Sequence, residues 1–115
     1  MPRSESVLRA LIIPPDGNGE VRDIEPDLDS MKEAIGGGWL EAVSGGDWVA
    51  YLDEEGKLKR LPVNVPASAL ARALGWPVGD VMCGTVMFVG PADSHGYDQS
   101  VSGEVVEMAR RAGIV

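Results

Sequence analysis

The sequence contains little cysteine and histidine, and each shortage excludes a class of site. A single cysteine, Cys83, cannot form an internal disulfide, and it lies in the apolar run VMCGTVMFV, where an inert buried thiol is usually found. One histidine is too few for a typical zinc site, which requires several Cys, His or acidic ligands. We therefore predict no metal, no cofactor and no catalytic site.

Long apolar runs and an excess of positive charge are also absent. No run approaches the ~20 apolar residues that a membrane helix requires, and the stretch MPRSESVLRALIIPP lacks the apolar core and cleavage site of a secretory signal. We therefore expect a cytosolic protein. The chain carries 10 Lys and Arg against 18 Asp and Glu, and this net charge of −8 disfavours direct binding to nucleic acid.

What is present is the composition of one folded domain. Hydrophobic residues make up 44% and charged residues 24% of the 115 positions, which is typical of a globular protein. We predict a single domain over residues 1–115.

Several segments have the pattern of β-strands. Residues 8–13 are mostly apolar on both faces, as in a central strand, and residues 21–24 follow the turn-rich PPDGNGE as a return strand. The segments WLEAV and WVAYL flank SGGD and form a second predicted pair. The run DVMCGTVMFVG predicts another central strand, in which Gly84 marks a bulge or a close backbone approach.

Three segments have the spacing and end signals of helices. We predict helices over residues 28–35, 66–74 and 101–112, with Asp27 and Ser102 as N-caps of the first and third. Together the segments predict an α+β fold, a mixed or antiparallel sheet of about five to six strands with three helices packed on its two faces.

The charged stretch DEEGKLKRLPVN lies between a predicted strand and a predicted helix. We interpret it as a hairpin, in which Tyr51 to Asp53 ends one strand, a polar turn follows, and Leu58 to Leu61 runs back. Its acids and bases would then be solvated and not catalytic. Asn64 is predicted to cap the next helix, which favours a structural role over ligand contact.

Two tryptophans on the second predicted hairpin are candidate contacts. Trp39 and Trp48 share a largely apolar face, which either a helix of the same chain or a ligand or partner must cover. The sequence leaves these two alternatives open.

The loop PADSHGYDQ contains the one histidine. His95 lies beside Asp93 and Tyr97, but adjacent loop residues seldom adopt the geometry of a catalytic triad. We keep His95 and Tyr97 as candidates because loops on rigid scaffolds often carry function.

The chain resembles the domain-of-unknown-function family 3846, whose small proteins occur in bacteriophages, plasmids and their bacterial hosts. The resemblance covers residues 7–90 and leaves out the C-terminal helix. It implies a mobile-element origin and an accessory role, and it brings no reaction and no ligand site. The residues that carry it are Ile24, Leu28, Met31, Ile35 to Gly37, Glu41, the turn from Asp53 to Leu58, Leu61 to Asn64, and Asp80 to Gly90.

Three functional hypotheses follow. The first is a non-enzymatic accessory protein that binds and occludes a host protein, in which a tryptophan is the anchor, the acids at 53–55 attract a basic surface, and a defence system is a plausible target. The second is a homo-oligomeric sponge for a nucleotide-like small molecule, and the third is a small enzyme that uses His95. The candidate binding residues are Trp39, Trp48, Tyr51, Asn64, Lys57, Arg60, His95 and Tyr97.

Overall fold

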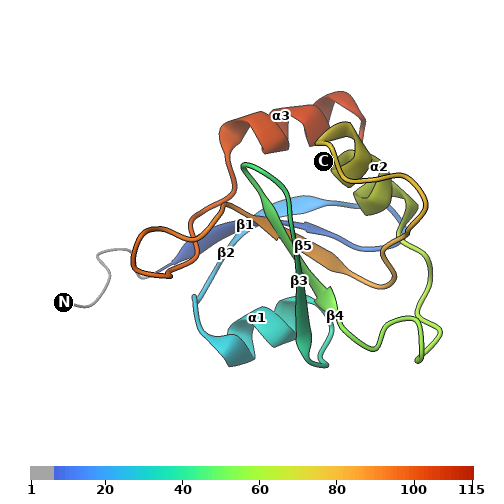
Figure 1. Cartoon of the computed structure of the whole chain (residues 1–115), viewed down its shortest axis with the longest axis horizontal. Coiled ribbons are helices and arrows are strands. Elements are labelled where there is room, and N and C mark those ends of the chain that lie inside the picture. Colours follow the sequence, from blue (N-terminus) through green and yellow to red (C-terminus); the bar gives the residue numbers. More distant parts are fainter. Residues whose placement is uncertain (1–6) are drawn as a thin grey trace.

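The computed structural model describes residues 7–115, and these form one five-stranded antiparallel sheet with three helices (Figure 1). The strand order is β2-β1-β5-β4-β3, so that β2 and β3 are the edges. The α+β prediction is confirmed, with the antiparallel form of the sheet. The elements are β1 (Leu8–Ile13), β2 (Glu20–Ile24), α1 (Leu28–Ala34), β3 (Leu40–Ser44), β4 (Val49–Asp53), α2 (Val65–Ala73), β5 (Val86–Val89) and α3 (Gly103–Arg111).

Helices cover both faces of the sheet. Helix α1 lies on one face, and α2 and α3 lie on the other (Figure 1). Strand β1 serves both layers, because Ala10 and Ile12 are buried toward α1 whereas Leu11 and Ile13 are buried toward α2 and α3. The prediction that the first strand is central and covered on two sides is therefore confirmed.

Each helix begins at the predicted cap. The side chain of Asp27 accepts a hydrogen bond from the Ser30 N–H at 2.8 Å, and that of Ser102 accepts one from the Val105 N–H at 3.2 Å. Asn64 caps α2 in the same way. The observed helices end within two residues of the predicted boundaries because side-chain caps and terminal glycines are local signals.

The predicted hairpin over residues 51–61 is wrong in its second half. Residues 54–60 form consecutive turns, closed by hydrogen bonds from the Lys59 N–H to the Glu55 oxygen and from the Leu61 N–H to the Gly56 oxygen, both at 2.9 Å. Leu58 is exposed and joins no strand. The cause is the Asp53 carboxylate, which accepts the Glu55 N–H at 2.9 Å and so turns the chain where a return strand was expected.

The second central strand is shorter than the pattern predicted. Only Val86–Val89 pair in the sheet, and the preceding residues form loops with one isolated bridge between Val63 and Cys83. Gly84 has a φ of +80°, and a Cβ at that position would lie 2.8 Å from a Leu61 side-chain carbon. A side chain therefore packs closely on this glycine, which lies before the strand and not within it.

Candidate functional site

An exposed tryptophan lies at the open end of the β3–β4 hairpin. Trp39, just before β3, is 59% exposed, although it is one of the largest apolar side chains in the protein. Its carbonyl oxygen accepts the Glu54 N–H at 2.9 Å, and the Lys32 ammonium of α1 lies 4.0 Å from the ring centroid. The backbone pairing and the cation–π contact hold the indole in place while it faces solvent.

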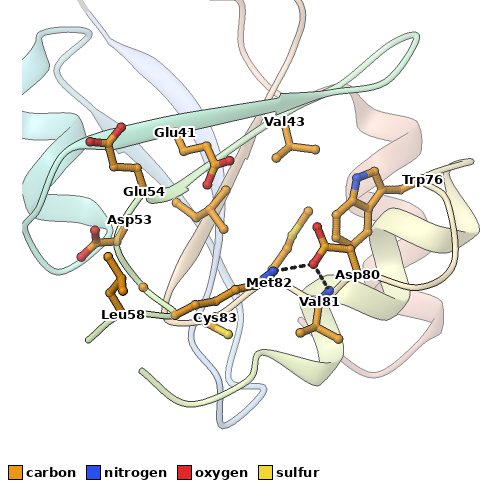
Figure 2. A pocket seen from close by; sticks show the side chains of 13 residues that line it. Glu41, Val43, Asp53, Glu54, Leu58, Trp76, Asp80, Val81, Met82 and Cys83 are labelled. Carbon is orange, nitrogen blue, oxygen red and sulfur yellow. Dashed lines mark hydrogen bonds and ion pairs between the residues drawn. The ribbon is translucent and has the colours of Figure 1, made fainter. Parts of the chain in front are cut away.

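Beside this end of the hairpin lies a pocket of about 230 Å³, which we call the acidic pocket (Figure 2). It is enclosed by strands β3 and β4, the turns at 54–58 and the loop at 76–83. Its lining side chains come from Glu41, Val43, Leu52, Asp53, Glu54, Lys57, Leu58, Trp76, Asp80, Val81, Met82 and Cys83.

Acids outnumber bases in the lining of this pocket. Lys57 is its one cation, and the Lys57 Nζ lies 2.5 Å from Asp80 Oδ1. The hydrogen bond from Lys57 is the main cause that holds the pKa of Asp80 below its ordinary value, and the Val81 N–H adds to it. The same contact raises the pKa of Lys57. Both remain charged at neutral pH, so Glu41 and Glu54 leave the pocket with a negative excess.

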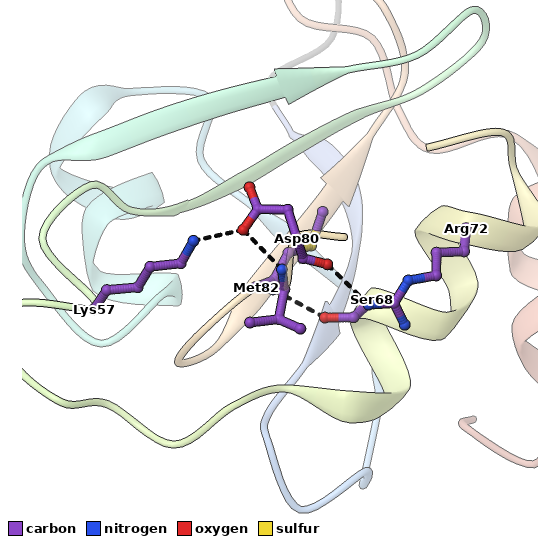
Figure 3. Close-up of polar contacts among 6 residues, drawn as sticks. Lys57, Ser68, Arg72, Asp80 and Met82 are labelled. Atoms are coloured by element: carbon purple, nitrogen blue, oxygen red, sulfur yellow. Dashed lines mark hydrogen bonds and ion pairs between the residues drawn. The ribbon is translucent and has the colours of Figure 1, made fainter. Parts of the chain in front are cut away.

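Helix α2 fixes the loop that carries Asp80. The Arg72 guanidinium donates to the Asp80 carbonyl oxygen at 2.8 Å, and the buried Ser68 hydroxyl accepts the Met82 N–H at 2.9 Å (Figure 3). These two contacts hold the backbone of the far wall of the acidic pocket to α2.

Asp53 contradicts the prediction that the charged stretch is solvated. Its side chain is 5% exposed, and Lys59 Nζ lies 2.7 Å from Oδ2. Burial on its own would raise the pKa of this carboxyl, but the hydrogen bonds from Lys59 and from the Glu55 N–H outweigh burial and lower the pKa. A Cβ on Gly38 would overlap the carboxylate, so the glycine makes room for it.

Three of the candidate residues have internal contacts. Trp48 is 2% exposed, lies 5.7 Å from Phe88 between ring centroids, and donates to the Leu74 carbonyl. Asn64 is fully buried, as its predicted structural role requires. Tyr51 is half-buried and donates to Asp98 at 2.8 Å, and burial together with that carboxylate raises the pKa of its phenol. The face with Trp48 is therefore covered by helices of the same chain, whereas Trp39 is open.

The loop with His95 lies apart from the acidic pocket. The Asp93 carboxylate accepts the backbone N–H groups of His95 and Tyr97, at 2.8 and 3.0 Å, and so organises the loop. Tyr97 borders a different hollow with Pro26 and Asp98. The hydrogen bond that Asp93 accepts from His95 comes from the peptide nitrogen, whereas a catalytic pair uses the imidazole.

The structure brings Lys57 into the acidic pocket and leaves Arg60 exposed in the same turns, with a φ of +58°. Sequence reasoning missed Glu41, Trp76 and Asp80. Glu41 had a signal, because it is the one charge in an otherwise apolar strand. Asp80 had none, since its partner Lys57 is 23 residues away. Cys83 is buried, as predicted.

Within residues 7–115, no helix is long and apolar enough to cross a membrane, and no group of His, Cys, Asp and Glu is arranged to hold a metal ion. Residues 8–112 match the family model described as Domain of unknown function (DUF3846). This match includes the C-terminal helix, which the resemblance drawn from the sequence had left out. No curated protein and no solved structure matches the chain.

Proposed function

Because the chain belongs to the DUF3846 family, for which no activity is described, we propose its function from the geometry of the site: it binds a basic surface of another protein. The observation that carries this proposal is Trp39, which is exposed, held in place by Lys32, and bonded through its backbone to Glu54, a residue that lines the acidic pocket. The binding is non-enzymatic, and its effect is to occlude the partner.

Trp39 has the properties of an interface anchor. Tryptophan is enriched among the residues that contribute most to protein binding, and its two side-chain torsions make it cheap to order. At Trp39 the Lys32 contact reduces this cost further, because the ring is already oriented in the free protein. Binding a partner would cover the exposed indole and gain the free energy that its solvation now costs.

Charge selects the partner. The net charge of −8 and the exposed acids Glu41, Glu54 and Glu55 favour encounter with a basic surface. Lys57 and Lys59 do not oppose such a partner, because each is paired with an acid, Asp80 or Asp53.

The same pairing disfavours the sponge hypothesis. A nucleotide-like ligand needs cations for its phosphates, and Lys57 and Lys59 are already paired with the carboxylates of Asp80 and Asp53. The geometry of Asp93 likewise gives no support to an enzyme based on His95. A protein partner is the function that these contacts favour.

The biological setting of the proposal follows from the family resemblance. We infer an accessory protein of a phage or other mobile element that acts in the bacterial cytosol on a host protein, with a defence component as the target class. The partner would carry an exposed Lys- or Arg-rich segment.

Affinity capture from a bacterial lysate tests the proposal. Wild-type protein should enrich a basic protein that Trp39→Ala fails to enrich, because the anchor is lost. Val65→Ala is the matched control, since Val65 is 66% exposed and lies outside the acidic pocket. Equal capture by wild type and Trp39→Ala would remove Trp39 as the anchor and with it the proposal.

A further inference from the structure

The two edges of the sheet differ in their protection against strand pairing. Strand β2 has the sequence EVRDI, in which three of five residues are charged, and β3 has the sequence LEAVS, in which only Glu41 is charged. Charged residues on an edge strand discourage the addition of another strand. Among the described residues, the β3 edge has one such charge, Glu41, against three on β2.

Strand β3 also offers a regular row of backbone groups. Trp39 and Gly45 flank β3 and each bond to a residue that flanks β4. The Glu54 N–H donates to the Trp39 oxygen, and the Gly45 N–H donates to the Trp48 oxygen. Antiparallel pairs alternate, so Glu41 and Val43 also bond to β4, in register with Leu52 and Ala50. The N–H and C=O groups of Leu40, Ala42 and Ser44 therefore point outward from the sheet.

We propose that an extended basic segment of the partner adds to the sheet as a sixth strand, antiparallel to β3. The inference rests on the proposed function and specifies how the partner binds. Main-chain hydrogen bonds to the outward groups supply affinity, as in other cases of strand addition, and the flanking side chains supply specificity.

The register of β3 fixes what the segment must contain. The side chain of Glu41 lines the acidic pocket, so a segment residue opposite Glu41 has its own side chain on that face. A Lys or Arg there forms an opposite-charge pair with Glu41 and lies near Glu54 and Asp80. Segment residues opposite Leu40 and Ala42 lie on the α1 face and are apolar.

A second copy of the chain is the competing occupant of this edge. Two β3 strands could pair edge to edge, but each copy carries a net charge of −8, and a dimer would bring the two acidic pockets together. Such self-repulsion keeps proteins monomeric and favours a basic partner.

Methylated peptides test the strand directly. The probe is a fluorescent peptide of alternating Lys and Val, about ten residues long, with binding followed by anisotropy. With Lys opposite Glu41, the Val residues have their N–H groups toward β3 and the Lys residues have theirs away from it. N-methylation of every Val should weaken binding at least about tenfold, and N-methylation of every Lys should leave it nearly unchanged.

Protein variants test the charge with a matched pair. Glu41→Lys and Glu20→Lys change the net charge equally and sit on opposite edges of the sheet. Glu41→Lys should weaken the unmodified peptide about tenfold, whereas Glu20→Lys should change it about twofold or less. Binding should also protect the amides of Ala42 and Ser44 from hydrogen exchange.

Each other outcome overturns the inference. If both methylated peptides bound equally well, the attraction would be electrostatic and no strand would form. If Trp39→Ala had also lost the lysate partner, the proposed function would still hold and only the strand addition would be wrong. If only methylation of the Lys residues abolished binding, the Lys N–H groups and not the Val N–H groups would face β3, which contradicts the assigned register. A concentration-dependent dimer that excludes the peptide would assign the edge to a second copy.

Discussion

Two tryptophans border the same hairpin and have opposite environments. Trp48, just before β4, is buried against Phe88 and under α2, whereas Trp39, just before β3, is exposed at the open end. The sequences of β3 and β4 do not predict which of the two tryptophans is buried. The difference shows that the elements packed over a hairpin, and not the hairpin itself, decide which aromatic side chain is core and which is free for binding.

Removing the buried tryptophan should have the largest effect. Trp48→Ala deletes a large side chain from the core and leaves a cavity beside Phe88, which should lower the free energy of unfolding by about 3–5 kcal/mol. Urea denaturation followed by circular dichroism measures this loss. A loss comparable to that of an exposed residue would mean that the indole is not part of the core.

Asn64 should be second in effect. Its side-chain amide donates to the carbonyls of Ile13 at 2.7 Å and Gly84 at 2.8 Å, and its oxygen accepts the Ala67 N–H. Asn64→Ala removes a helix cap and leaves buried carbonyls unpaired, so we expect a loss of about 3 kcal/mol. Ser102→Ala removes a cap alone and should cost about 1 kcal/mol in the same urea measurement.

If Asn64→Ala cost no more than Ser102→Ala, the two bonds to Ile13 and Gly84 would contribute nothing beyond the cap. The buried asparagine would then be an ordinary helix start, and the link that it makes between β1, α2 and the loop before β5 would have no energetic weight.

Two glycines in the loop between β3 and β4 test how tightly Trp48 is packed at the closed end of the hairpin. A Cβ on Gly45 would overlap the Trp48 indole, whereas a Cβ on Gly46 meets nothing within 4 Å. Gly45→Ala should therefore destabilise the protein by about 1–2 kcal/mol through overpacking. Gly46→Ala should be neutral or stabilise by about 0.4–1 kcal/mol through the unfolded chain. Thermal unfolding of the pair checks this, and equal shifts would contradict the contact.

Asp53 gives the open end of the hairpin a stability that depends on pH. Its pKa is lowered from 3.8 in the folded state, so its stabilising contribution is present above that value and is lost as pH falls through the folded pKa. Wild type should be more stable than Asp53→Asn at about pH 7, and this difference should shrink below about pH 4. Glu54→Gln, at an exposed neighbour, should show a smaller difference at neutral pH, by urea denaturation at each pH.

An Asp53→Asn difference that stayed constant from neutral to acid pH would show that Lys59 does not stabilise the ionised carboxylate. The turn from 54 to 60 would then owe its shape to the backbone hydrogen bonds alone.

Sequence reasoning succeeded where the signal is local. The caps at Asp27, Asn64 and Ser102 were predicted because a capping side chain and the backbone N–H that donates to it lie three residues apart. The two-sided apolar pattern of residues 8–13 likewise fixed a central strand.

Sequence reasoning failed where a contact joins residues far apart in the chain, or where the same residue types are compatible with two local structures. The stretch after Asp53 has the residues of a polar hairpin tip, but the buried Asp53 carboxylate accepts hydrogen bonds from the Glu55 N–H and from Lys59, and these accompany the turns that are observed. The acidic pocket depends on Asp80, whose contacts with Lys57 and Arg72 come from the tertiary arrangement. No local pattern encodes such contacts.

Trp39→Ala should have the smallest effect on stability and the most specific effect on binding. The side chain is 59% exposed and its ring contacts Lys32 through a cation–π interaction, so the loss should be less than about 1 kcal/mol. The Lys-Val peptide should nevertheless bind about tenfold more weakly, because the anchor beside the β3 edge is gone.

Lys32→Ala is the matched control: it removes the cation–π contact but keeps the Trp39 ring, and it should weaken peptide binding only about twofold. A Trp39→Ala protein that unfolded as readily as Trp48→Ala would make both ends of the hairpin core, whereas one that stayed stable and kept full affinity would leave the exposed indole without a role in recognition.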